Sequence, residues 1–197
     1  MKKFPLVLAL FAVFANTFIW LTLKNRPGIS AENGSMENFQ LICLLLSFSL
    51  WLAARFGSNN NPEKFLLLAL AIFNLSFFIL EIDTRDFDMP LVNKYIRGKY
   101  RNVALGCLWL GTAWLFFREK KTNWLEFLKW LKTPSAICMI ASGVLWMISG
   151  LNDKHLLGRK DLYFEELMEV NATLLMVISP ILFLQSCKRV NHLNPTG

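Results

Sequence analysis

Acidic side chains gather where two long apolar stretches of the sequence end or begin. One run, Glu81 to Asp88, directly follows the apolar stretch 65–80, and a second, Lys160 to Asn171, leads into the apolar stretch 167–187. Closely spaced carboxylates repel one another, so some must take up a proton, pair with a basic side chain or bind a cation. Oxygen ligands of this kind suit Mg²⁺, Ca²⁺ or Mn²⁺. The two runs therefore predict an acidic site.

Helical spacing indicates which carboxylates face one another. If the second run is helical, Glu165, Glu169 and Thr173 lie on one stripe, and Asn74 and Glu81 share a face of the preceding helix. Glu81 and Glu169 lie closest to the apolar boundary, where a carboxylate normally faces the interior of a helix bundle. We therefore predict that Glu81 and Glu169 are catalytic. The metal ligands predicted beside them are Asp83, Glu165 and Glu166.

Basic residues come from the same loop as the first acidic run. Arg85 follows Glu81 by four residues, which is a spacing that allows an ion pair on a helix. The residues predicted to hold a substrate phosphate beside the carboxylates are Arg85, Arg97, Lys99 and Arg101. A purely structural role stays open, because acids in the first turns of a helix are stabilised by its dipole and the other carboxylates can pair with these bases.

Other catalytic patterns are absent from the sequence. There is no glycine-rich phosphate loop, no H-E-x-x-H and no C-x-x-C, and the four cysteines stand singly inside apolar stretches. Ser142-Gly143 and Ser149-Gly150 suggest a nucleophilic serine, but no histidine lies in another apolar stretch to act as its base. Other polar residues inside the stretches are predicted to hydrogen-bond between helices. They are Asn16, Gln40, Ser47, Ser76, Thr112 and Gln185.

The elements that position these residues are apolar and long. The chain has 197 residues, of which 54% are hydrophobic and 18% charged, against about 25% charged in a soluble domain. A membrane-spanning helix needs about 20 predominantly apolar residues. We predict an all-α integral membrane protein, a six-transmembrane-helix bundle in one domain, 1–197. The predicted spans are Phe4–Leu23, Phe39–Phe56, Phe65–Leu80, Val103–Phe117, Pro134–Leu151 and Leu167–Cys187.

Two further features concern the membrane surface. The segment from Asn123 to Lys132 alternates Trp and Leu with Lys and Glu, which favours a short interfacial helix between the fourth and fifth spans, although a simple linker stays open.

An even number of spans places both termini on one side, and Lys2 and Lys3 indicate that this side is the cytoplasm. We expect an uncleaved first helix in a bacterial inner (plasma) membrane, with a signal peptide as the alternative.

Three classes of function fit these observations. The first is a membrane enzyme whose acidic site, with or without a divalent cation, acts on a lipid or lipid-linked substrate. The second is a non-catalytic protein that assembles with membrane protein partners or maintains the cell envelope, and the third is a small transporter. Nucleic acid is excluded as a partner, because the net charge of +7 is spread over the ends of apolar stretches and forms no contiguous patch.

Overall fold

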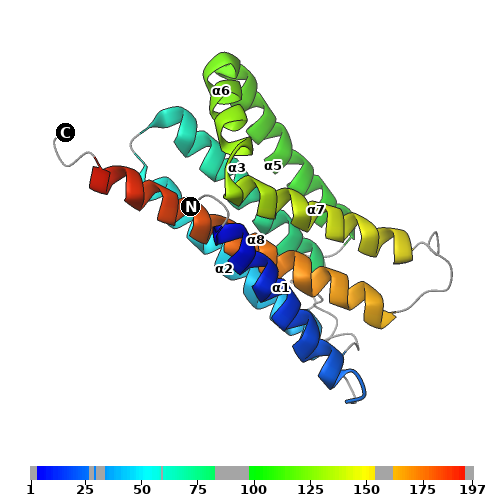
Figure 1. Ribbon diagram of the computed structural model, residues 1–197. Coiled ribbons are helices and arrows are strands. Elements are labelled where there is room, and N and C mark those ends of the chain that lie inside the picture. Colours follow the sequence, from blue (N-terminus) through cyan, green and yellow to red (C-terminus); the bar gives the residue numbers. More distant parts are fainter. Residues whose placement is uncertain are drawn as a thin grey trace.

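All regular secondary structure in the described residues is α-helical. The computed structural model describes residues 4–26, 29, 34–58, 60–82, 98–153 and 162–193. Within these ranges the chain forms seven helices, labelled as in Figure 1. They are α1 (Phe4–Leu23), α2 (Ser35–Gly57), α3 (Asn61–Glu81), α5 (Gly98–Arg118), α6 (Lys120–Leu131), α7 (Pro134–Asp153) and α8 (Leu162–Leu193).

Five of the helices are long and apolar enough to cross a membrane: α1, α2, α3, α7 and α8. The predicted class of an α-helical membrane protein is consistent with this result. Helix α5 forms over the predicted span 103–117 but is not among the five. Its first turns carry Lys99 and Arg101, which leaves an apolar part shorter than a span of about 20 residues. The predicted count of six spans is therefore not confirmed.

Helix α6 forms over most of the segment predicted to be an interfacial helix. It has 12 residues, which is too short for a span. Trp124, Leu125 and Leu128 on this helix are exposed, and so are Lys121 and Lys129. Exposed apolar and basic side chains on one short helix are typical of a helix in the headgroup region. Its position in a membrane stays a prediction.

Helix α8 lies at the centre of the bundle. It packs against α7, α2 and α1, while α2 also packs against α3, and α3 contacts α5 and α6 (Figure 1). The most apolar stretch of α8 is 61% buried inside the protein, whereas the most apolar stretch of α1 is only 11% buried. The bundle therefore positions side chains of α8 tightly, whereas α1 presents most of its apolar surface outwards.

Apolar side chains of α2, α3, α7 and α8 form the main core. Leu44, Trp51, Leu67 and Met176 are fully buried there. Ser47 Oγ donates a hydrogen bond of 2.7 Å to the carbonyl oxygen of Met176, which joins α2 to α8. Small residues and interhelical hydrogen bonds of this kind let helices approach closely in a membrane, where apolar burial alone drives no association.

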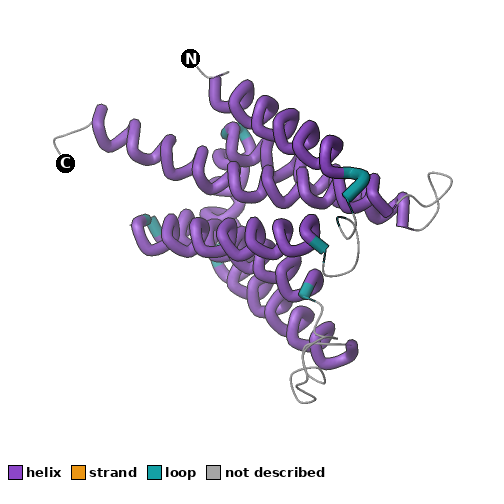
Figure 2. Tube along the Cα trace, turned by 90° about the horizontal axis from the view of Figure 1, so that it is seen from below, coloured by secondary structure: helices purple, strands orange, loops and turns teal. Residues whose placement is uncertain are grey.

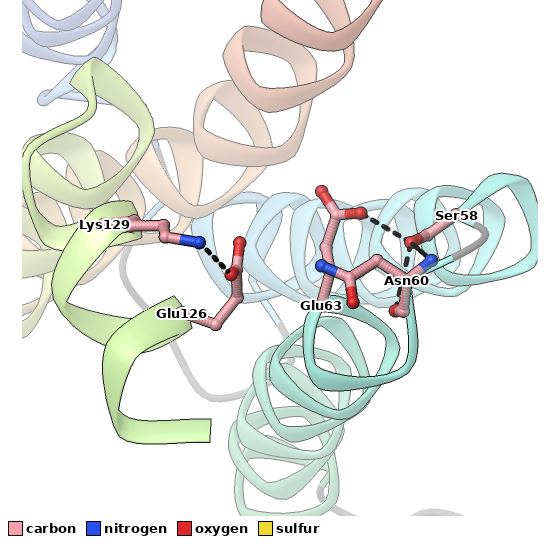
Figure 3. A network of polar contacts seen from close by, with 5 residues as sticks. All are labelled: Ser58, Asn60, Glu63, Glu126 and Lys129. Atoms are coloured by element: carbon pink, nitrogen blue, oxygen red, sulfur yellow. Dashed lines mark hydrogen bonds and ion pairs between the residues drawn. The ribbon is translucent and has the colours of Figure 1, made fainter. Parts of the chain in front are cut away.

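The helices alternate in direction and so define two ends of the bundle. At one end α1, α3 and α7 finish while α2 and α8 begin, and we call this the acidic end. The opposite end, called the α6 end, holds α6, the start of α1 and the end of α8 (Figures 1 and 2). There Ser58 Oγ donates to Glu63 Oε2 at 2.5 Å across the α2–α3 turn, and Lys129 pairs with Glu126 at 3.0 Å on α6 (Figure 3).

Candidate functional site

Carboxylates from three helices lie together at the acidic end. Glu81, the last residue of α3, interacts electrostatically with Glu169 and Glu166 of α8 and with Glu37 in the first turn of α2. Glu166 also interacts with Glu165. We call these five residues the acidic cluster, and all five side chains are partly buried. The structure thus brings Glu81 and Glu169, the two predicted catalytic residues, into electrostatic range of each other.

Two interhelical hydrogen bonds orient the carboxylates of α8. Gln40 of α2 donates from Nε2 to Glu166 Oε2 at 2.8 Å, and Ser149 of α7 donates from Oγ to Glu169 Oε1 at 2.6 Å. Hydrogen bonds to a carboxylate are stronger than those between neutral groups. Four helices, α2, α3, α7 and α8, therefore contribute to one polar site.

Gln40 also presents a buried acceptor that no described residue satisfies. Its side chain is fully buried, and Oε1 has no hydrogen-bond partner among the described residues. Buried polar atoms are nearly always paired, so Oε1 of Gln40 is an acceptor open to a donor or a cation at this site. The sequence predicted an interhelical hydrogen bond for Gln40, and its bond to Glu166 of α8 confirms that prediction.

Arg101 supplies an opposite charge near the cluster. The guanidinium of Arg101 attracts Glu81 electrostatically, and its Nη1 donates a 3.2 Å hydrogen bond to the carbonyl oxygen of Leu80 at the end of α3. Arg101 was predicted as a substrate-binding residue, and the structure places it beside the acidic cluster. Lys99, predicted in the same role, is exposed in the first turn of α5.

Three predicted site residues lie outside the described residues: Asp83, Arg85 and Arg97. Their predicted roles as a metal ligand and as phosphate-binding residues stay predictions. Within the described part of the chain, no group of three or more His, Cys, Asp or Glu side chains has an arrangement that could hold a metal ion.

A second polar network fixes α1 to α8 near the acidic end. Asn16 Nδ2 donates to Asn171 Oδ1 at 3.0 Å, and Asn171 Nδ2 donates to Thr17 Oγ1 at 3.0 Å. Trp20 Nε1 donates to Asn16 Oδ1, and Tyr163 donates its hydroxyl hydrogen to the carbonyl oxygen of Trp20. This network satisfies the amide groups internally, so it acts as a structural anchor for a helix that buries little apolar surface.

Sequence analysis did not identify Glu37 as part of the site. The signal available was its position three residues before Gln40, at the start of a helix that begins at the same end as α8. Ser149 was considered as a nucleophile or as a small residue that allows close helix packing, whereas its hydroxyl group donates to Glu169. Both residues become recognisable only when the neighbouring helix is known.

Comparison with known proteins adds no assignment. The sequence matches no family model, and no curated protein or solved structure is significantly similar to it. The function has to be argued from the residues of the acidic cluster.

Proposed function

We propose that this integral membrane protein uses the acidic cluster, at the extracytoplasmic membrane boundary, to bind a divalent cation and act on a lipid or lipid-linked substrate. The observation that carries the proposal is that Glu81 of α3 lies within electrostatic range of Glu169 and Glu166 of α8. Clustered carboxylates in a bundle interior repel one another, and a cation relieves this repulsion. Glu81 and Glu169 are the proposed catalytic carboxylates.

The ligand chemistry favours a hard cation. Carboxylates and the amide oxygen of Gln40 supply only oxygen donors, which suit Mg²⁺, Ca²⁺ or Mn²⁺. Glu165, Glu166 and Asp83 are the proposed ligands, with Gln40 Oε1 as an added neutral donor. When bound, such a cation polarises a phosphoryl oxygen of the substrate.

The substrate class follows from the position of the cluster and from its basic neighbours. A site where apolar helices end is reached from the headgroup region of a bilayer, where the phosphates of lipids lie. Arg101, with Arg85, Arg97 and Lys99, is proposed to bind such a phosphate. With α5 as a sixth span, both termini share the cytoplasmic side of a bacterial plasma membrane, which supports an extracytoplasmic site.

Thermal unfolding of the detergent-solubilised protein tests the cation. A cation present at 100 times its dissociation constant stabilises the native state by about 2.7 kcal/mol. We expect Mg²⁺, Ca²⁺ or Mn²⁺ to raise the melting temperature, EDTA to reverse the rise, and Glu81→Gln or Glu169→Gln to remove it. The matched control, Glu63→Gln at the α6 end, should keep the full response. No rise with any of the three cations would contradict the proposal.

A second candidate function is that of a non-catalytic assembly partner, and the surface of α1 favours it. Val7, Phe11, Phe14 and Phe18 are each at least 60% exposed and recur at helical spacing along one face. A partner helix could cover this face as well as lipid does. Cross-linking through a photoreactive residue at position 14 in the membrane, compared with position 42 on α2, would reveal such a partner.

A further inference from the structure

An aromatic groove opens at the α6 end, opposite the acidic cluster. It has a volume of about 480 Å³ and lies between α3, α5, α6 and α7. This volume falls in the range of about 300–1,000 Å³ typical of small-molecule sites. Its aromatic lining includes Phe65, Phe73, Trp109, Phe116, Trp124 and Phe127. Such a lining accepts a hydrocarbon chain.

One buried polar atom in the groove, Oδ1 of Asn123, has no hydrogen-bond partner among the described residues. Asn123 is only 4% exposed and forms part of the lining. Its Nδ2 donates to the carbonyl oxygens of Leu115 and Phe116 at 3.5 and 3.2 Å, in the last turn of α5. These two bonds fix the amide group, and Oδ1 has no hydrogen-bond partner among the described residues. Asn123 therefore offers a buried acceptor to a hydroxyl or amine on a bound molecule.

The corner beside Asn123 is basic. The junction of α5 and α6 carries three exposed basic side chains, Arg118, Lys120 and Lys121, with Glu119 between them. At the other end of α6, Lys132 is exposed and Lys129 pairs with Glu126. The excess of positive charge at the α5–α6 junction, close in sequence to the lining residue Asn123, complements an anionic headgroup.

We propose that this groove binds a single-chain anionic phospholipid of the lysophospholipid class. The acyl chain lies along the aromatic lining, and the phosphate lies at Arg118, Lys120 and Lys121. The free glycerol hydroxyl, which is next to the acyl chain in such a lipid, donates to Asn123 Oδ1. A two-chain lipid has no free hydroxyl at this place, and a choline headgroup cancels the negative charge, so the three features together select one class of lipid.

Native mass spectrometry of the full chain in a non-ionic detergent tests the proposal with three lipids. Lysophosphatidic acid has the chain, the hydroxyl and the charge. Phosphatidic acid lacks the free hydroxyl, and lysophosphatidylcholine lacks the net charge. We expect lysophosphatidic acid to bind about tenfold more tightly than either of the other two lipids. Phosphatidic acid loses one hydrogen bond and lysophosphatidylcholine loses one or two charge contacts, and each loss lowers the affinity by about this factor. Equal binding of the three lipids would overturn the proposal.

Variants assign the binding to the groove. Ala113→Trp fills the groove and should abolish binding of lysophosphatidic acid, whereas Ala104→Trp, at an exposed position of the same helix outside the lining, should not. The double variant Lys120→Gln/Lys121→Gln should weaken binding roughly thirtyfold. Equal effects of the two Trp variants would refute the groove as the site. A dimer in detergent that Ala113→Trp dissociates would instead assign the groove to a second copy of the chain.

The contribution of Asn123 is measured by the ratio of the affinities for lysophosphatidic acid and phosphatidic acid in one variant. Asn123→Leu should bind lysophosphatidic acid and phosphatidic acid equally, because the hydroxyl group loses its acceptor. The ratio compares two lipids on the same protein, so it does not depend on a change in stability. An unchanged preference for lysophosphatidic acid in this variant would overturn the assigned role of Asn123.

Discussion

Gln40 on α2 donates a hydrogen bond of 2.8 Å from Nε2 to Glu166 Oε2 on α8, across 126 residues of sequence. The amide is fully buried and its other polar atom, Oε1, is left beside the acidic cluster without a partner among the described residues. Gln40 therefore joins α2 to α8 through Glu166, and its Oε1 adds a neutral oxygen to the acidic cluster.

Replacing Gln40 with Leu should destabilise the protein. The variant removes the interhelical hydrogen bond of Gln40 and leaves the partly buried carboxyl group of Glu166 without this donor, at a cost of about 1–3 kcal/mol. Thermal unfolding in detergent measures the loss. Gln185→Leu, at an exposed position near the end of α8, is the matched control and should change little. An equal effect of both changes would contradict the role given to Gln40.

Ser149→Ala tests the contact between α7 and α8. The hydroxyl group of Ser149 donates to Glu169 at 2.6 Å, and its removal should cost about 1–3 kcal/mol because the partly buried carboxylate loses its donor. Denaturation in detergent is the measurement. Ser49→Ala provides the control, since Ser49 is exposed and donates only to its own helix. Stability unchanged in Ser149→Ala would show that Glu169 does not depend on this bond.

Asn171→Ala should loosen α1. This change removes the amide that joins Asn16 and Thr17 to α8, and interhelical hydrogen bonds in membranes contribute on average about 0.6 kcal/mol each. We expect lower efficiency of a disulfide cross-link engineered between α1 and α8, with a small change in overall stability. Asn102→Ala, exposed on α5, should leave the cross-link unchanged. A cross-link of full efficiency in Asn171→Ala would argue against the anchor.

Cysteine labelling tests whether α5 crosses the membrane. In a cysteine-free background, Lys99→Cys should react with an impermeant reagent added outside the cell, and Thr122→Cys should react only after the membrane is opened. Lys99 lies in the first turn of α5 and Thr122 lies after α5, in the first turn of α6, and both are exposed. Labelling of both positions from outside would show that α5 does not span, and labelling of Thr122 alone would reverse the proposed orientation.

The sequence predicts where the helices lie better than it predicts which helices can span a membrane and which polar residues join them. Stretches of about 20 apolar residues predict α1 and α7 within a few residues, since length and polarity decide them. Helix α5 shows the limit, because Lys99 and Arg101 extend it beyond its short apolar part. Most polar residues predicted to bond between helices do so, such as Asn16 and Ser47. Thr112 instead donates within its own helix.

The candidate site was only partly predictable. Residues on one helix, such as Glu165 and Glu169, share a stripe that periodicity reveals. The contribution of Glu37 depends on how α2 packs against α8, and the aromatic groove depends on four helices at once. Such relationships arise from tertiary packing, and one sequence carries no periodic signal for them.

The binding of Mn²⁺, followed by electron paramagnetic resonance of the free ion, tests the central claim most directly. We expect the purified protein to remove about one Mn²⁺ per chain from solution, in competition with Mg²⁺ or Ca²⁺. The double variant Glu81→Gln/Glu169→Gln should bind none, while Glu63→Gln/Glu126→Gln at the α6 end should bind as the original protein does. Absence of Mn²⁺ binding, or equal binding by both double variants, would contradict the proposed cation site.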